Sequence, residues 1–172
     1  MNPKASEIKC LLLDIDGVMT NGAITYSANG DETKIYNVKD GFGLTLLKKE
    51  GFILGIITAR YATPIIERRA VELKFDELIM GQRNKLEAYE QIKQKYQLED
   101  RNIAYMGDDI IDLQVLMKCG YSGCPQDAHR EVLLRSDFIS TKNGGNGAVR
   151  EFIEDILKAR GLWDGILKSH LL

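Results

Sequence analysis

Two aspartates follow a short apolar run near the N-terminus. Residues 10–17 read CLLLDIDG, so Asp14 and Asp16 end the run and a glycine interrupts it. A short apolar run without helical period predicts a strand buried on both faces of a parallel sheet. Side chains at positions i and i+2 of a strand point to the same side, so both carboxylates should face one point beyond the strand's carboxyl end. Two carboxylates that close need a divalent cation, a shared proton, or both; the alternative is a solvated turn that caps a strand.

Three further groups of polar residues follow predicted strands or open predicted helices. They are Thr58, Lys85 and the acidic group Asp108, Asp109 and Asp112. Taken singly, each has a plain structural explanation: a strand-end cap, a solvated lysine, and acids that favour a helix N-terminus. Taken together, they fall where a doubly wound sheet brings loop residues from different strands to one place. The sequence therefore predicts one shared site.

The residue types of this shared site favour phosphoryl transfer. Several carboxylates suit Mg²⁺, which takes one or two carboxylates and leaves positions for substrate phosphate and water. The cation would neutralise phosphate charge and allow attack by a carboxylate. A hydroxyl from Thr58 and an ammonium from Lys85 would donate to the phosphoryl oxygens. We therefore expect a Mg²⁺-dependent enzyme that acts on a phosphate ester.

The elements that position these residues alternate along the chain. Besides the strand within residues 10–17, strands are expected at 52–58, 77–80, 102–106, 121–124 and 138–140. Helices are expected at 41–50, 63–73, 84–96, 110–118, 127–134 and 148–160. This alternation predicts an α/β fold, a Rossmann-like doubly wound parallel sheet in a single domain of residues 1–172, with intervals too short for a cap domain. A β-hairpin at 23–38 should protrude from it, and residues 161–172 form a tail that is packed or frayed.

The composition limits the partners. The 172 residues are 44% hydrophobic and 28% charged, with a net charge of −2, which disfavours nucleic acid as a partner. No run approaches about 20 apolar residues, so we expect no membrane span and a cytoplasmic location. Three cysteines at uneven spacing argue against a disulfide framework. A zinc site of Cys119, Cys124 and His129 would lack a fourth ligand, so buried thiols are favoured.

Four segments together resemble the signature motifs of the haloacid dehalogenase superfamily of phosphohydrolases. They are DIDGV at 14–18, ITAR at 57–60, Lys85 and GDDIID at 107–112, in the superfamily's order. Within it, the chain resembles a small capless group through the hairpin and the segments NVKDGFG at 37–43 and GGNGAVRE at 144–151. The resemblance implies a phosphomonoester hydrolase that acts on a phosphorylated eight-carbon 2-keto sugar acid through an aspartyl-phosphate, in lipopolysaccharide precursor synthesis.

The same resemblance assigns roles to the predicted site residues. Asp14 is the nucleophile, and Asp16 protonates the leaving group and later deprotonates water. Thr58 and Lys85 bind the transferring phosphoryl group. Mg²⁺ is held by Asp14, by the backbone carbonyl of Asp16 and by Asp108.

The resemblance also implies residues around the metal and the sugar. Asp109 and Asp112 would orient the groups that surround Mg²⁺. The positions that contact substrate in this group are Asn37, Val38, Lys39, Asp40, Gly41, Arg60 and Arg68. Guanidinium groups suit a carboxylate or a phosphate, although Arg68 on an exposed helix face also has a purely solvated explanation. Where the group often carries a basic residue this chain has Thr45, which keeps a nine-carbon acid, sialic acid or KDN 9-phosphate, as an alternative substrate.

Members of the capless group resemble one another in forming homotetramers, in which a neighbouring subunit covers the active site. The hairpin residues Ile24, Tyr26, Ile35 and Tyr36 offer apolar contact area for such an assembly. An alternative of another class is a signalling receiver domain, which also gathers aspartates, a threonine and a lysine around Mg²⁺. The order of the acidic groups and the presence of Asp16 favour turnover over storage of a phosphoryl group.

Overall fold

Six parallel strands form the central sheet. The computed structural model of the chain describes residues 2–61 and 63–171. The strands of this sheet are β1 (Cys10–Leu13), β4 (Ile53–Ile57), β5 (Glu77–Ile79), β6 (Ile103–Met106), β7 (Tyr121–Cys124) and β8 (Phe138–Ile139). They lie in the order β5-β4-β1-β6-β7-β8, and every neighbouring pair is parallel. The predicted doubly wound α/β fold is confirmed.

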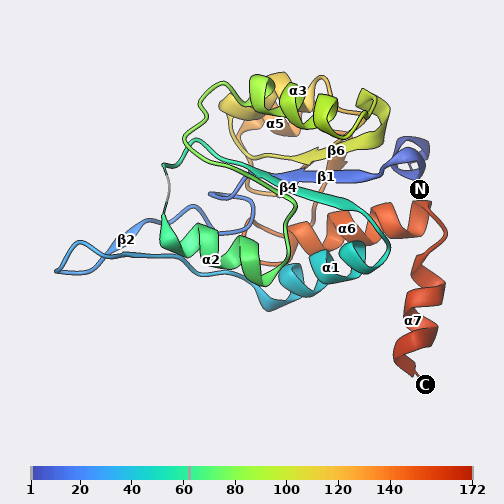
Figure 1. The fold of residues 1–172 in the computed structure, drawn as a ribbon, viewed down its shortest axis with the longest axis horizontal. Coiled ribbons are helices and arrows are strands. Elements are labelled where there is room, and N and C mark those ends of the chain that lie inside the picture. The colour runs from blue at the N-terminus through green and yellow to red at the C-terminus, as the bar shows by residue number, and fades with distance from the viewer. Residues whose placement is uncertain (1, 62, 172) are drawn as a thin grey trace.

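Helices cover both faces of the sheet (Figure 1). One face carries α1 (Val38–Lys49), α2 (Pro64–Glu72) and α6 (Ala148–Ala159), and the other carries α3 (Lys85–Lys95), α4 (Leu113–Leu116) and α5 (Arg130–Leu133). The 3₁₀ helices are Pro3–Glu7, Asp100–Asn102 and Ile110–Asp112. Leu11 and Leu13 pack on the first face and Cys10 and Leu12 on the second, because alternate strand residues point to opposite sides. Burial on both faces explains the uninterrupted apolar sequence of β1.

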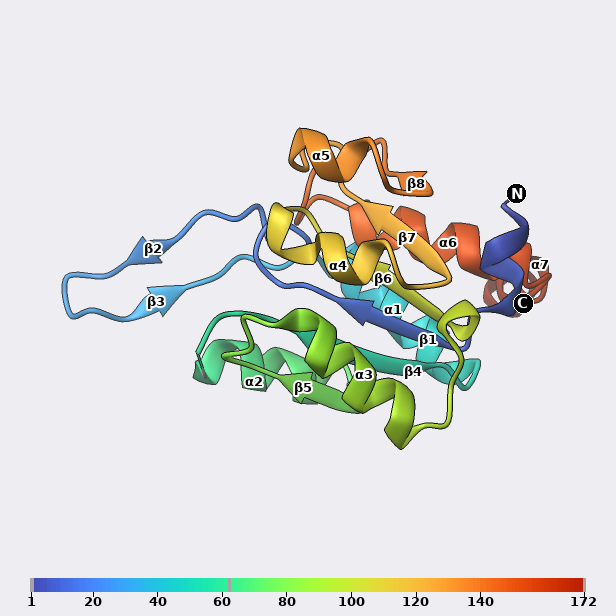
Figure 2. The ribbon, with the colours of Figure 1, turned by 90° about the horizontal axis from the view of Figure 1, so that it is seen from above.

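The predicted hairpin is present and projects away from the sheet (Figure 2). Its paired segments are β2 (Thr25–Tyr26) and β3 (Glu32–Thr33), which are antiparallel. The second arm ends earlier than predicted, because α1 begins at Val38 rather than at residue 41. Asn37 starts this helix by accepting a hydrogen bond from the Lys39 N–H at 2.8 Å, which is the usual role of an N-cap asparagine.

Two other predicted helices are shorter in the structure. Residues 110–118, predicted as one helix, form a 3₁₀ turn followed by α4. The side chains of Asp109 and Asp112 each accept a backbone N–H at this turn, and such bonds favour tight turns over a regular helix. Of the predicted helix 127–134, only α5 is helical. The Asp127 side chain does not cap a helix that begins there, because it accepts the N–H of Gly144 at 2.9 Å.

The C-terminal tail forms a helix, α7 (Trp163–Leu171), which the sequence left undecided between a packed and a frayed segment. Ile166 is buried in the core that lies on the α1 and α6 face. The Trp163 ring lies under two cations of α6, Arg150 at 5.6 Å and Lys158 at 5.4 Å. The first half of the tail therefore packs on its own chain. No helix in the described part of the chain combines the length and the apolar character needed to cross a bilayer.

We predict that Gly144→Ala destabilises the fold. A Cβ atom at Gly144 would lie 1.8 Å from the carbonyl oxygen of Gly17, and backbone cannot move aside as a side-chain end can. The free energy of unfolding, measured by urea titration, should fall by about 1–3 kcal/mol. The control is Gly165→Ala in α7, where an added Cβ meets nothing within 4 Å and should be neutral or stabilising by up to about 1 kcal/mol. Equal effects of the two substitutions would contradict this loop contact.

Candidate active site

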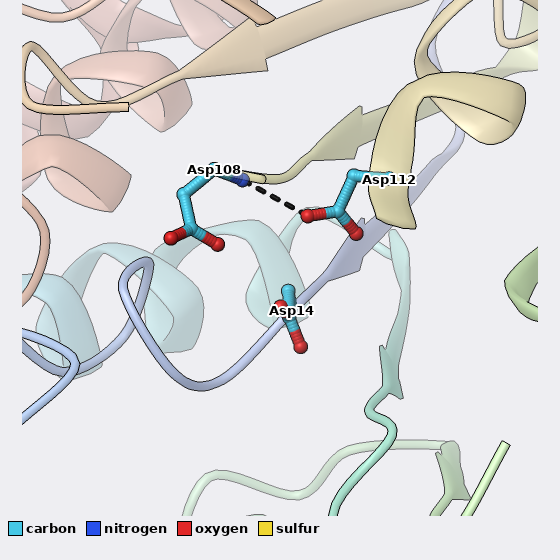
Figure 3. Close-up of side chains that lie close together, drawn as sticks. All are labelled: Asp14, Asp108 and Asp112. Atoms are coloured by element: carbon cyan, nitrogen blue, oxygen red, sulfur yellow. Dashed lines mark hydrogen bonds between the residues drawn. The ribbon is translucent and has the colours of Figure 1, made fainter. Parts of the chain in front are cut away.

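The carboxyl ends of three adjacent strands bring predicted site residues together. Asp14 follows β1, Thr58 follows β4, and Asp108 lies two residues beyond β6. The last residue of β1 is in register with the last residue of β6 and with the fourth residue of β4. From β1, the chain adds β4 and β5 on one side of the sheet and then β6, β7 and β8 on the other, so the strand order reverses at β1. Open α/β sheets bind ligands at such a point. Figure 3 shows Asp14, Asp108 and Asp112 turned toward one another.

Lys85 connects two of these carboxylates. It is the first residue of α3, and only 1% of its side chain is exposed. Its Nζ lies 2.8 Å from Asp14 Oδ2 and 2.6 Å from Asp112 Oδ1. A buried ammonium requires such compensation, and the two carboxylates raise the pKa of Lys85 against the opposing effect of burial. Lys85 therefore stays charged beside Asp14.

Asp112 uses both carboxylate oxygens for hydrogen bonds within the chain. Oδ1 accepts from Lys85 Nζ and from the Tyr105 hydroxyl at 2.5 Å. Oδ2 accepts the N–H groups of Asp108 at 3.0 Å and Asp109 at 3.2 Å. A carboxylate has about four acceptor positions, so little is left for a metal ion. Asp112 therefore orients its neighbours, and Tyr105 belongs to the site although sequence reasoning missed it.

Asp14 and Asp108 are the other two carboxylates of the cluster. With Asp112 they outnumber the one ammonium that contacts the cluster among the described residues, that of Lys85. Burial raises the pKa of Asp14 to about 6, although Lys85 opposes this rise. Burial and then the charges of Asp14 and Asp112 raise the pKa of Asp108 to about 8. One oxygen from each of Asp14, Asp108 and Asp112 lies within 4.8 Å of the others. This arrangement fits a divalent cation between Asp14 and Asp108.

Gly17 allows the Asp108 carboxylate to approach the loop after β1. A Cβ atom at Gly17 would lie 2.0 Å from Asp108 Oδ2, and the residue has a φ of +82°. Only glycine tolerates both conditions. The carboxylate thus lies against the backbone that includes the Asp16 carbonyl, the third predicted ligand.

Asp16 is held by two cations. Arg60 Nε lies 3.2 Å from Asp16 Oδ2, and Lys34 Nζ forms an ion pair with Asp16 Oδ1. Glu32 binds both cations, Arg60 Nη2 at 2.7 Å and Lys34 Nζ at 3.2 Å. Sequence reasoning predicted Arg60 but missed Lys34 and Glu32. The signal that could have found them is the hairpin pairing, which returns the chain after Glu32 toward the end of β1.

Three of the predicted sugar-binding residues make contacts within the chain. Asn37 caps α1 and its Nδ2 donates to the Gly145 carbonyl at 3.4 Å. Asp40 is buried and accepts the Arg150 N–H at 2.8 Å. Gly41 is packed so closely that a Cβ there would lie 2.4 Å from an Arg69 nitrogen. These three residues fix the start of α1 next to α2 and α6.

Arg60, a fourth, is the partly buried partner of Asp16 and Glu32, and the other three predicted sugar-binding residues are exposed. Val38 and Lys39 lie on the first turn of α1. Arg68 is 83% exposed and its nearest carboxylate is Glu72 at 3.6 Å. Thr45 donates its hydroxyl proton to the carbonyl one turn earlier in α1, at 3.1 Å.

The cysteines are buried free thiols, as predicted. His129 does not face Cys119 or Cys124 as a ligand, because its Nδ1 accepts the N–H of Glu131 at 3.2 Å and caps α5. The described residues therefore give these side chains structural roles.

Proteins of similar sequence match almost the whole chain. A family model described as haloacid dehalogenase-like hydrolase matches residues 70–153. The chain is 40% identical over 161 residues to the 3-deoxy-D-manno-octulosonate 8-phosphate phosphatase KdsC of Escherichia coli (strain K12), a match that covers 94% of this chain and 85% of that protein. It is 38% identical over 162 residues to KdsC of Yersinia pestis, with 94% and 86% covered.

Solved structures that resemble this chain come from the same family of phosphatases. The phosphatase of the same substrate from Moraxella catarrhalis, in complex with a magnesium ion, a phosphate ion and a KDO molecule, matches with a TM-score of 0.95 and 41% identity over 97% of this chain and 95% of that chain. A cobalt-bound form of the Haemophilus influenzae phosphatase matches with a TM-score of 0.89 and 32% identity, covering 93% of each chain. The chain therefore belongs to the haloacid dehalogenase-like hydrolases, in the family of the 3-deoxy-D-manno-octulosonate 8-phosphate phosphatases, which are phosphoric monoester hydrolases.

Proposed function

We propose that the chain hydrolyses 3-deoxy-D-manno-octulosonate 8-phosphate (KDO 8-phosphate) to KDO and phosphate. The observation that carries the proposal is the Asp14 carboxylate, held 2.8 Å from Lys85 Nζ in a carboxylate cluster that fits a cation. Identity of 40% to KdsC over 94% of the chain supports the substrate, as does the relative that binds magnesium, phosphate and KDO. The product would enter lipopolysaccharide synthesis, as the resemblance implies.

The proposed reaction has two steps. In the first, an Asp14 carboxylate oxygen bonds to phosphorus, the bond between phosphorus and the sugar oxygen breaks, and Asp16 gives that oxygen a proton. In the second, water bonds to the phosphorus of the aspartyl-phosphate, Asp16 takes a proton from the water, and the Asp14 carboxylate is released. Lys85 and Thr58 donate hydrogen bonds to the phosphoryl oxygens in both steps.

We propose Mg²⁺ as the cofactor, held by Asp14, Asp108 and the Asp16 carbonyl. When bound, Mg²⁺ neutralises charge on the phosphoryl oxygens. Asp112 holds the N–H groups of Asp108 and Asp109, so it fixes the loop that presents the Asp108 carboxylate.

Two alternatives differ in their support. A nine-carbon acid, sialic acid or KDN 9-phosphate, stays open because Thr45 departs from the basic residue of the group. The receiver-domain alternative loses support, because the matched relatives are phosphatases over 94% of this chain. Side-by-side hydrolysis of eight- and nine-carbon acid phosphates decides the substrate.

The assembly and the compartment are also proposals. We propose a homotetramer in which a neighbour covers the site, supported by the exposure of Ile24, Tyr26 and Ile35 on a hairpin that projects from the sheet. The buried free cysteines support a reducing compartment, and we propose the cytoplasm.

We predict that Asp14→Asn lowers kcat for KDO 8-phosphate by about 10⁴-fold or more, the scale seen when a nucleophile is removed. Rapid acid quenching with ³²P-labelled substrate should trap a phosphoprotein in the native chain and none in the variant. The matched control is Asp164→Asn on α7, which is exposed and should leave kcat unchanged. A phosphoprotein in Asp14→Asn would place the nucleophile elsewhere.

We predict that Mg²⁺ stabilises the fold more at pH 8.5 than at pH 5.5. The pKa values of Asp14 and Asp108 are raised to about 6 and about 8, so the metal-free fold loses stability as the pH rises through these values. Ionised carboxylates also bind the cation better. At pH 8.5 and about 100 times the dissociation constant, Mg²⁺ should raise the unfolding midpoint by about 5–10 °C.

Calorimetry at both pH values checks the effect of Mg²⁺ on stability. Asp108→Asn should abolish most of the Mg²⁺-dependent rise at pH 8.5. A rise of the same size at pH 5.5 and pH 8.5 would contradict the assignment of the raised pKa values to the metal site.

We predict that the native chain sediments as four copies. Replacing Ile24, Tyr26 and Ile35 together by serine should yield smaller species, because the hairpin loses its apolar contact area. Leu134→Ser is the control, since Leu134 is 66% exposed at the end of α5, outside the hairpin. Analytical ultracentrifugation measures all three proteins, and a monomeric native chain would refute the tetramer.

A further inference from the structure

Asp127 is an exposed residue whose carboxylate holds a glycine-rich loop. We call this segment, residues 142–147 between β8 and α6, the glycine loop. Asp127 Oδ1 accepts the N–H of Gly144 at 2.9 Å. A loop N–H lacks the partner that a helix or a strand supplies, and a carboxylate is a strong acceptor for it. The position of the glycine loop therefore depends on Asp127.

The glycine loop packs directly on the backbone that follows β1. The N–H of Gly145 donates to the Val18 carbonyl at 2.9 Å. A Cβ atom on Gly144 would lie 1.8 Å from the carbonyl oxygen of Gly17. A Cβ atom on Gly145 would lie 2.5 Å from the carbonyl carbon of Thr20. Because backbone meets backbone here, a displacement of the glycine loop changes the position of residues 17–20.

Gly17 in turn lies between two proposed Mg²⁺ ligands. Its nitrogen belongs to the same planar peptide unit as the Asp16 carbonyl. A Cβ atom on Gly17 would lie 2.0 Å from Asp108 Oδ2. Mg²⁺ demands near-ideal octahedral geometry, so its affinity depends on the distance between these two ligands. The placement of Gly17 sets that distance.

The segment that carries Asp127 also holds Asp108 from the other side. The His129 N–H donates to the backbone carbonyl of Asp108 at 2.7 Å. Residues 127–129 therefore hold both halves of the proposed metal site. They hold Asp108 directly, and they hold the backbone after β1 through the glycine loop. Asp127 supplies the second of these links.

We propose that Asp127 is a positioning residue for the Mg²⁺ site. It fixes the glycine loop, and the loop keeps Gly17 and the Asp16 carbonyl at the distance from the Asp108 carboxylate that the cation needs. Asp127 is not a member of the carboxylate cluster, so it acts through the backbone and not as a ligand. The inference rests on the proposed function, because it concerns the ligands proposed there for Mg²⁺.

The surroundings of Asp127 define two alternatives to this role. Asp127 lines a hollow of about 240 Å³ together with Ile35 of the hairpin and residues of the glycine loop. A contact with the sugar in this hollow would change the KM of the substrate. A role in stability alone would change the unfolding midpoint. A positioning role changes the affinity for Mg²⁺.

The first test is Mg²⁺ binding without substrate, measured by isothermal titration calorimetry. Asp127→Ala should raise the Mg²⁺ dissociation constant about 10-fold, the lower end of the range for groups that orient metal ligands. Asp127→Asn should stay within about twofold of the native chain, because an amide oxygen still accepts the Gly144 N–H. If Asp127→Asn weakens binding as much as Asp127→Ala, the charge matters rather than the contact, and the proposal is overturned.

The matched control is Asp76→Ala at the opposite end of the sheet. Asp76 Oδ2 accepts the Leu54 N–H at 2.9 Å, which is the same kind of bond at the same length, near the amino ends of β4 and β5. Asp76→Ala should lower the unfolding midpoint and leave the Mg²⁺ dissociation constant unchanged. Equal weakening of Mg²⁺ binding by Asp76→Ala and Asp127→Ala would assign the effect to stability and overturn the proposal.

Hydrolysis of KDO 8-phosphate gives a second readout. Asp127→Ala should need about ten times more Mg²⁺ for the half-maximal rate, while KM at saturating Mg²⁺ stays within about twofold of the native value. A larger rise of KM with unchanged Mg²⁺ affinity would make Asp127 a sugar contact and overturn the positioning role.

The calorimetric test uses no substrate, so it holds whichever phosphate ester the chain hydrolyses. A native chain that binds no Mg²⁺ would overturn the proposed cofactor together with the role of Asp127. Native Mg²⁺ affinity in Asp127→Ala would overturn the role of Asp127 alone.

Discussion

The ion pairs of Lys85 are the interaction on which the rest of the site depends. A single ammonium, almost fully buried, separates the carboxylates of Asp14 and Asp112 at the carboxyl ends of the central strands. Without it, two acids would face each other in a poorly solvated place, and uncompensated buried charge of this kind costs about 3–5 kcal/mol. The position of Lys85 at the first turn of α3 thus links the stability of the fold to the geometry of Asp14, the proposed nucleophile.

The sheet supplies the coarse positions and hydrogen bonds supply the fine ones. Parallel register places Asp14 level with the end of β6, and Asp112 then fixes the following loop through the N–H groups of Asp108 and Asp109. Tyr105 holds Asp112 from inside the sheet. The proposed nucleophile Asp14, the proposed metal ligands and Lys85, the proposed phosphoryl-binding residue, therefore rest on rigid elements. Asp16, the proposed acid and base, differs, because its partner Lys34 comes from a projecting hairpin.

The sequence predicts the strand-end part of the site because its causes are local. An apolar run that ends in aspartate predicts a buried strand, and parallel topology then aligns Asp14, Thr58 and Asp108 without further information. Lys34 could not be predicted in this way. It lies in a hairpin whose neighbouring residues are exposed, and its burial comes with contacts to Asp16 and Glu32 that only the folded chain makes.

Helix boundaries show the same division between local and long-range causes. The N-cap signal of Asn37 is local, yet the β-branched Val38 beside it favours a strand and moved the predicted start of α1 to residue 41. The short turn after Asp109 depends on the carboxylate of Asp112, which in turn depends on Lys85 and Tyr105. The tail helix α7 has a glycine in its interior and gains its order from contact with α6, which no local pattern reports.

Because β1 is a central strand of the sheet, both of its edges stay unpaired during part of the chain's synthesis. β1 leaves the ribosome before both of its partners, β4, paired from Ile53 onward, and β6, paired from Ile103 onward. One edge of this apolar strand stays uncovered until β4 emerges and the other until β6 emerges. Because an unpaired apolar strand promotes aggregation, the segment Cys10–Leu13 is open to aggregation until β6 has emerged.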